Sequence, residues 1–125
     1  STIHGVLNIH PGCLPSYRGK NCPEWAVLQG DRVIITAHIM DIEYVEGDVL
    51  GLLEVDWRPL KSYFEFRRQV YLKSFELASK VSLDLVESKA SVLYNTHDSM
   101  QPSIIPEVMS DELLRHVKNS FGMAY

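Results

Sequence analysis

Two polar side chains near the start of the chain, Asn8 and His10, are the first candidates for chemistry. They are separated by one position and follow the short apolar run Gly5-Val6-Leu7. Side chains alternate between the two faces of a β-strand, so a strand here places the amide and the imidazole side by side. Two adjacent hydrogen-bonding groups at the end of a strand, one of which titrates near neutral pH, are typical of the edge of an active site.

A loop follows this pair directly. Pro11 ends the strand because proline has no N–H to donate to a neighbouring strand. Pro15 and Gly19 bracket a loop that carries Tyr17 and Arg18. We predict these two residues as substrate-binding residues, because the loop lies beside the polar pair.

Arg18 has two possible roles. Its guanidinium can bind a phosphate or a carboxylate of a substrate. It can equally hold its own loop in place by pairing with Asp31 or Glu24. The sequence leaves both roles open.

Two other kinds of site are weaker candidates. His10, His38 and Asp41 are possible zinc ligands by type, although their spacing matches no standard metal-binding motif. Cys13 near His10 suggests a thiol nucleophile, but no third group that would orient the pair is evident. His97 and Asp98 in a late loop are another candidate pair, for which an exposed polar turn is the simpler interpretation.

The elements that must position these residues follow from apolar periodicity and from turn residues. β-Branched runs predict strands, and apolar residues spaced by three, four and seven predict helices. The expected elements are strands over residues 5–10, 33–40 and 49–55, a short strand at 91–94, and helices over 23–28, about 62–88 and about 110–121. The strands at 33–40 and 49–55 are close enough in sequence to pair as a hairpin.

The long helix shows both a start signal and a core face. Ser62 followed by Glu65 has the form of a capping box, and Ser110 begins the final helix in the same way. The expected core face of the long helix is widened by further apolar positions. Its members are Tyr63, Phe66, Val70, Leu77, Val81 and Leu85, and the widening residues are Phe64, Tyr71, Phe75 and Ala78.

Bulk composition limits the function classes. The chain has 125 residues, a net charge of −4 and no basic block, which argues against nucleic acid or an anionic membrane as the main partner. The two cysteines, Cys13 and Cys22, permit one disulfide, but reduced thiols in a cytoplasmic protein are the expectation. No apolar run reaches the length of a transmembrane helix, and no signal peptide precedes the first strand.

An ordered set of motifs resembles the folate-dependent formyltransferases, a family that includes methionyl-tRNA, glycinamide ribonucleotide and sugar N-formyltransferases. A long series of spaced matches is more specific than Asn-x-His alone. The loop 17–21 is most similar to the sugar-modifying members. The motifs are Asn8-x-His10-Pro11-x-x-Leu14-Pro15-x-Tyr17-Arg18-Gly19, Trp25-Ala26-Val27, Gly30-Asp31, His38, Met40-Asp41 and Gly47-Asp48-Val49-Leu50.

The resemblance implies a fold, a reaction and residue roles. The fold would be an α/β domain with a Rossmann-like sheet. The formyl donor would be 10-formyltetrahydrofolate, and the acceptor would be a primary amine, possibly of a sugar nucleotide. Asn8 would hydrogen-bond the oxyanion that forms when the amine attacks, and His10 would stabilise that intermediate and handle a proton.

The sequence departs from the family pattern at the acid. The family has an aspartate two residues before the Gly-Asp of its acidic loop, and Val45 stands at that position here. Valine can neither orient a histidine nor order a water molecule. Glu46 and Asp48 are the possible substitute acids, with Glu43 also nearby.

A second departure concerns the part of the family's domain that precedes the Asn-x-His strand. Those strand–helix units have no counterpart here, so we expect one formyltransferase-like domain over residues 1–125 that lacks the N-terminal half. The first strand would then be an exposed edge. A homodimer that covers this edge is the expected partner arrangement.

Together these observations predict an α/β fold with a small mixed sheet, a long packed helix and a C-terminal helix, as a partial Rossmann-like formyltransferase domain. We expect it to be incomplete or inactive as this chain, and to use 10-formyltetrahydrofolate if active. The alternative is a non-catalytic dimerisation or interaction module that keeps the fold. A ligand-binding domain with only an acceptor pocket is the third option.

Overall fold

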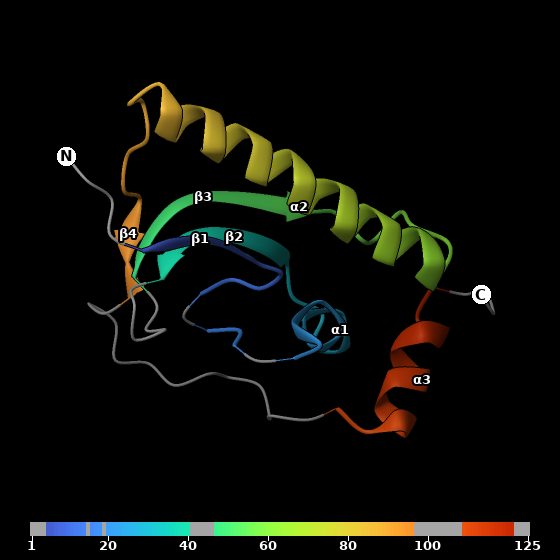
Figure 1. Ribbon diagram of the computed structural model, residues 1–125. Helices are drawn as coiled ribbons and strands as arrows, with labels where there is room; N and C mark the ends of the chain where they lie inside the picture. The colour runs from blue at the N-terminus through green and yellow to red at the C-terminus, as the bar shows by residue number, and fades with distance from the viewer. Residues whose placement is uncertain (1–4, 15, 19, 41–46, 97–108, 122–125) are drawn as a thin grey trace.

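In the part of the chain that the structure describes, a four-stranded sheet and three helices form the fold (Figure 1). The computed structural model describes residues 5–14, 16–18, 20–40, 47–96 and 109–121. The element boundaries lie within two or three residues of those that the sequence predicts. In chain order they are β1 (Val6–His10), α1 (Cys22–Leu28), β2 (Val33–Met40), β3 (Asp48–Val55), α2 (Tyr63–Val86), β4 (Tyr94–Asn95) and α3 (Asp111–Asn119).

The strands are ordered β1-β2-β3-β4 in space. The expected α/β class is confirmed, and β2 and β3 form the expected hairpin. The sheet, however, was expected to be mixed, and all three pairings between its described strands are antiparallel. The connection from β2 to β3 covers only residues 41–47, which is shorter than the dozen or so residues that a parallel crossover needs.

The two faces of the sheet are covered by different parts of the chain. Helix α2 crosses one face, and the loop after β1 lies with α1 at the other (Figure 1). On β2, Ile35 and Ala37 belong to the core cluster that includes residues of α2. Thr36 and His38 alternate with them and bond residues of β1 and its loop. The period of two along β2 therefore separates a packing face from a polar face.

Helix α2 docks closely on the sheet at Gly51. A Cβ added there would lie 3.0 Å from Leu77 Cδ1 and 3.0 Å from Val81 Cγ2. Phe66, Val70, Leu77 and Val81 are the buried residues of α2, which confirms most of the predicted core face. A side chain at position 51 would therefore require the side chains of Leu77 and Val81 to shift.

The residues that were expected to widen the core face behave differently. Phe64, Tyr71 and Phe75 are 70%, 64% and 57% exposed. They lie on a flank of α2 outside the core, where Phe64 and Tyr71 help to line a groove next to β1, because one face of a helix this long already fills the space above β2 and β3. This correction leaves an aromatic surface without a partner among the described residues.

Helix α3 closes one end of the core. Phe121, which follows it, stacks on Phe66 with ring centroids 5.1 Å apart, and Val117 is fully buried. The predicted helix starts are confirmed: Ser62 accepts from the amide of Glu65 and Ser110 from that of Leu113. Within the described part of the chain, no helix is long and apolar enough to cross a membrane.

Candidate functional site

The polar face of the sheet brings together two cross-strand pairs. Asn8 lies opposite His38, and His10 lies opposite Thr36. Asn8 and His10 therefore sit beside each other at the end of β1, as the alternation of strand side chains requires. From the sequence, His38 was interpreted as a possible metal ligand and as one of the residues of the family motif, and no role was predicted for Thr36. The polar residues at every second position of an otherwise apolar strand were the available signal.

The amide of Asn8 is bonded to a buried histidine. Asn8 Nδ2 lies 3.0 Å from His38 Nε2, and His38 is 2% exposed. An amide NH₂ can only donate, so Nε2 accepts and the proton of the neutral ring is on Nδ1. Burial, and then the charge of His10, lower the pKa of His38 to about 4. His38 is therefore a neutral acceptor at physiological pH.

The ring of His10 is oriented by its own loop. Its Nε2 lies 2.7 Å from the carbonyl oxygen of Tyr17. Because a carbonyl can only accept, Nε2 carries the proton, and in the neutral ring Nδ1 is the basic nitrogen. The thiol of Cys22 lies 3.7 Å from the same Nε2. A backbone acceptor thus fixes the tautomer of a histidine that can take up a proton.

The cysteines beside this site are protonated thiols. Burial, and then the charge of Glu24, raise the pKa of Cys22 to about 11, and burial raises the pKa of Cys13. Neither cysteine is in a disulfide, as expected for reduced thiols. A thiol with a raised pKa is a poor nucleophile near neutral pH. This argues against the thiol-nucleophile alternative.

Bonds from two strands and one bond within the loop hold the loop after β1. Thr36 Oγ1 on β2 donates to the carbonyl of Gly12. The hydroxyl of Tyr94 on β4 donates to the carbonyl of Leu14 at 2.7 Å. The backbone amide of Tyr17 donates to the Cys13 carbonyl at 2.8 Å. The loop that orients His10 is therefore tied to the sheet rather than free-standing.

Tyr17 points into the protein. Its side chain is 3% exposed, and its hydroxyl lies 2.7 Å from Asp31 Oδ2 and 2.8 Å from Gln29 Oε1. Burial and the bond to Asp31 raise the pKa of this hydroxyl well above its ordinary value. Tyr17 thus anchors the loop, and a substrate contact by Tyr17 stays a prediction.

Arg18 lies half-buried next to Tyr17. The two acids that the sequence offered as its partners are bonded to other side chains. Asp31 is bonded to Tyr17, and Glu24 accepts from Arg67 at 3.1 Å. A substrate-binding role for Arg18 also stays a prediction.

Of the candidate acids for the site, only Asp48 lies within the described residues. Asp48, at the start of β3, is half-buried and accepts from Asn95 Nδ2 at 2.6 Å. Val45, Glu43 and Glu46 lie outside the described residues, as do Asp41, His97 and Asp98. Among the residues that the structure describes, no three His, Cys, Asp or Glu side chains are placed to hold a metal ion.

Sequence comparisons identify related proteins. Residues 1–70 match the family model described as formyl transferase, which is more than half of the chain. The methionyl-tRNA formyltransferase of Borrelia duttonii is 26% identical over 102 residues, which cover 81% of this chain and 33% of that protein. The methionyl-tRNA formyltransferase of Clostridium tetani is 32% identical over 111 residues, which cover 87% of this chain and 31% of that protein. The chain thus spans about a third of the length of these relatives.

Solved structures show the same fold. A 4-N formyltransferase from Francisella tularensis superposes with a TM-score of 0.65 at 23% identity, over 94% of this chain and 52% of that one. A formyltransferase from Anoxybacillus kamchatkensis was solved with UDP-4,6-dideoxy-4-formamido-L-AltNAc and tetrahydrofolate. It superposes with a TM-score of 0.55 at 18% identity, over 78% of this chain and 50% of that one. These matches show a shared fold over about half of each solved chain.

Proposed function

The chain belongs to the formyl transferase family, and we propose that its β1 edge carries the reacting groups for transfer of a formyl group to an amine. The observation that carries this proposal is the paired placement of Asn8 and His10, each held in one orientation by a bond to a neighbouring element. Preorganised groups of this kind are what acyl transfer requires of a protein.

Asn8 supplies a hydrogen-bond donor for the oxygen of the formyl group. Negative charge develops on that oxygen as the amine nitrogen attacks the formyl carbon. One N–H of Nδ2 is bonded to His38, and the second N–H is the donor for the oxygen. Such a donor contributes most when it is already oriented, because no reorganisation is then needed during the reaction.

His10 supplies the base. The attacking amine must lose a proton as the new C–N bond forms, and a neutral imidazole accepts a proton efficiently near pH 7. With Nε2–H bonded to the carbonyl of Tyr17, Nδ1 is the nitrogen that takes up the proton. The same group can return that proton to the departing nitrogen of the donor.

A folate-type donor fits the formyl end of this site. The second Nδ2 hydrogen of Asn8 matches a formyl oxygen, and the contact of the first with His38 Nε2 orients the amide. When bound, 10-formyltetrahydrofolate supplies an activated formyl group. Tetrahydrofolate in the Anoxybacillus structure supports this donor class.

An amino group on a nucleotide-linked sugar is the proposed acceptor. The same solved structure contains a UDP-linked formamido sugar. Arg18, beside the loop that orients His10, carries a charge that suits a diphosphate. The absence of a disulfide between Cys13 and Cys22 agrees with a reducing, cytoplasmic compartment, which we propose as the location.

The experiment that tests this proposal is a transfer assay with 10-formyltetrahydrofolate and a panel of UDP- and dTDP-linked 4-amino sugars, read by mass spectrometry of the product. We expect Asn8→Asp and His10→Ala each to lower the rate by about 10²–10³. Asn8→Asp keeps the shape but removes the donor. In parallel, the fluorescence of Trp25 and Trp57 is followed during titration with 5-formyltetrahydrofolate. The proposal is refuted if the chain shows no transfer and no binding at millimolar ligand.

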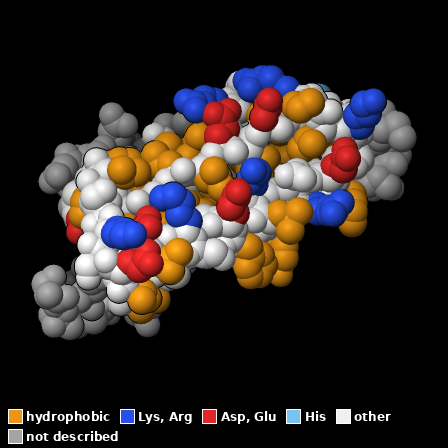
Figure 2. Space-filling model, turned by 90° about the horizontal axis from the view of Figure 1, so that it is seen from above, with side chains coloured by type: hydrophobic (Ala, Val, Ile, Leu, Met, Phe, Trp, Pro, Cys, Tyr) orange, Lys and Arg blue, Asp and Glu red, His pale blue; other side chains and the backbone are white. Residues whose placement is uncertain are grey.

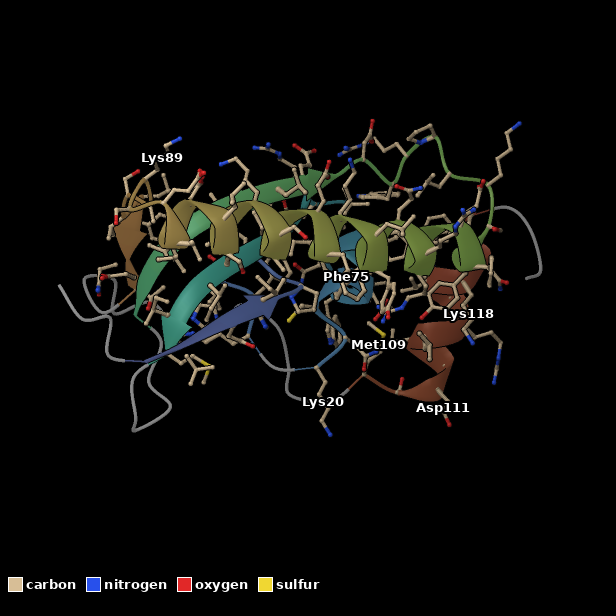
Figure 3. All side chains as sticks on the ribbon, turned by 45° about the horizontal axis from the view of Figure 1, so that its top comes forward. Lys20, Phe75, Lys89, Met109, Asp111 and Lys118 are labelled. Carbon is tan, nitrogen blue, oxygen red and sulfur yellow. The ribbon has the colours of Figure 1, made fainter. Side chains whose placement is uncertain are left out.

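A second candidate function is a dimerisation module. The aromatic flank of α2, formed by Phe64, Tyr71 and Phe75, lies beside β1, the edge strand of the sheet. Figure 2 shows hydrophobic side chains along this flank, and Figure 3 shows Phe75 projecting on the side where β1 forms the edge. A groove of about 520 Å³ between α2 and β1 is lined by Ile9, Pro11, Arg67 and Tyr71, among others.

A second copy of the chain is the proposed occupant of this surface. A two-fold axis beside β1 pairs the two β1 edges as antiparallel strands and places the two α2 helices antiparallel. One axis thus covers both the open strand edge and the aromatic flank.

A further inference from the structure

The amide of Asn8 and the imidazole of His38 form the most specific polar contact on the sheet. We propose that His38 is a positioning residue, which holds the carboxamide of Asn8 in the one orientation that presents N–H rather than C=O to a substrate. This inference rests on the proposed role of Asn8 in formyl transfer.

An asparagine side chain has two nearly isosteric orientations, related by exchange of its oxygen and nitrogen. Only one of them places a donor where a developing oxyanion needs it. In the structure, Nδ2 of Asn8 lies 3.0 Å from Nε2 of His38. An acceptor at this position selects the orientation with nitrogen toward His38, because the flipped amide would place two acceptors in contact.

His38 can perform this selection only while it is neutral. A proton on Nε2 would make that atom a donor and favour the flipped amide of Asn8. The ring is 2% exposed, and the neighbouring charged group is His10, which lies on the adjacent strand. Burial and the charge of His10 both disfavour protonation of His38 and lower its pKa to about 4. The ring is therefore neutral throughout the neutral range, and Nε2 is an acceptor in the tautomer that carries its proton on Nδ1.

The strand pairing next to His38 is irregular. The pairing of β2 with β3 shifts between Ala37 and His38, where Ala37 lies opposite Gly51 and His38 opposite Val49. Bulges of this kind re-aim a side chain and are frequent next to active sites. The residue left without a partner in this pairing is Leu50 of β3, so the irregularity lies in the strand next to His38.

The other ring nitrogen of His38, Nδ1, lowers the stability of the fold. Nδ1 of His38 is buried and has no hydrogen-bond partner among the described residues. A buried donor without a partner typically costs about 1–3 kcal/mol, so an apolar side chain would suit this position better for stability alone. The bond to Asn8 is therefore the reason that we infer for an imidazole at this position.

The first test is nuclear magnetic resonance of the ¹⁵N-labelled protein. We expect a through-hydrogen-bond coupling between Asn8 Nδ2 and His38 Nε2, and a His38 ring that carries its proton on Nδ1 at pH 7. A ring protonated on Nε2, or the absence of this coupling, overturns the inference. This readout needs no substrate, so it decides the inference even if no transfer activity is found.

The second test compares His38→Gln, whose side-chain oxygen can accept in place of Nε2, with His38→Leu, which cannot. For His38→Leu we expect kcat to fall about 10- to 100-fold with little change in the KM of the amine, because only the reacting geometry is lost. His38→Gln should restore most of kcat. Ile35→Val is the matched control, a buried β2 residue on the opposite face.

The outcomes separate the two proposals. If the unmodified chain transfers formyl groups and His38→Leu, folded by circular dichroism, keeps full kcat, the positioning role is wrong. If the unmodified chain shows no transfer with any acceptor, the proposed function fails, while the coupling measurement still supports or overturns the role of His38.

Discussion

Gly12 lies directly against the ring of His10. A Cβ added at position 12 would be 2.9 Å from His10 Nε2, 2.9 Å from the Tyr17 carbonyl oxygen and 3.0 Å from Cys22 Cβ. Those are the two atoms of the bond that fixes the His10 tautomer, together with the neighbouring thiol residue. The absence of a side chain at position 12 is therefore what allows this bond to form.

The first prediction is that Gly12→Ala separates His10 from the carbonyl of Tyr17. The methyl group would occupy space that the bond now uses, and real Cβ contacts this short are essentially never seen. We expect the ring signals of His10 to shift in NMR spectra, and any formyl transfer to fall at least tenfold because the base is misplaced.

Gly30→Ala is the control for this prediction. Gly30 has a φ of +69°, so alanine there is strained, yet no atom lies within 4 Å of the added Cβ. We expect it to lower the Tm while leaving the His10 signals in place. Unchanged His10 signals in Gly12→Ala itself would contradict the packing argument.

The second prediction concerns stability in acid. The pKa of His38 falls from an ordinary 6.5 to about 4 on folding. Between these values the unfolded chain binds a proton and the folded chain does not, so stability falls as the pH drops from 6.5 toward 4 and this contribution levels off below 4. A shift of this size corresponds to about 3 kcal/mol.

Urea unfolding at pH 7, 6, 5 and 4 measures this dependence. His38→Gln removes the titrating group, so its free energy of unfolding should change less over the same range than that of the unmodified chain. Parallel pH dependences in the two proteins would assign the acid sensitivity to other groups.

Much of the fold is predictable from the sequence because the signals are local. β-Branched runs gave the limits of β2 and β3. Ser62 and Ser110 each mark a helix start through a bond to a backbone amide three residues on. The exposure of Tyr71 and Phe75 was not predictable, because periodicity shows that apolar residues share a face but not how wide a face the sheet can cover.

Part of the candidate site was likewise predictable from the sequence, and part of it was not. Asn8 and His10 stand out in the sequence because strand alternation alone makes them neighbours. The role of His38 depends on the pairing of β1 with β2, across thirty residues of chain. The anchoring of Tyr17 by Asp31 depends on a loop fold for which no periodic pattern exists. Long-range register and loop packing are the parts that local patterns do not encode.

The third prediction concerns the buried carboxylate of Glu24, which is 1% exposed. It accepts from Arg67 at 3.1 Å and from Asn21 Nδ2 at 3.0 Å. Arg67→Ala leaves this charge buried with one partner fewer. Because Arg67 is itself 48% exposed, we expect a loss of about 1–3 kcal/mol in the free energy of unfolding, less than for a fully buried pair.

Lys73→Ala is the matched comparison on the same helix. Lys73 pairs with Glu76 at 3.3 Å on the surface, where such pairs contribute about 0–0.5 kcal/mol. Equal losses in the two variants, measured by urea unfolding, would mean that the burial of Glu24 does not amplify its ion pair.

The fourth prediction is that the aromatic flank of α2 holds two copies of the chain together. Tyr71 and Phe75 pack edge to face with ring centroids 4.9 Å apart, and both remain more than half exposed. Sedimentation equilibrium should therefore show a dimer of the unmodified chain. Tyr71→Glu should yield a monomer, because a carboxylate at the two-fold contact loses its water without gaining a partner. Leu83→Glu, on another flank of the same helix and 57% exposed, should stay dimeric. A monomeric unmodified chain at tens of micromolar would refute the dimer. If both variants were monomeric, the added negative charge, rather than its place on this flank, would control association.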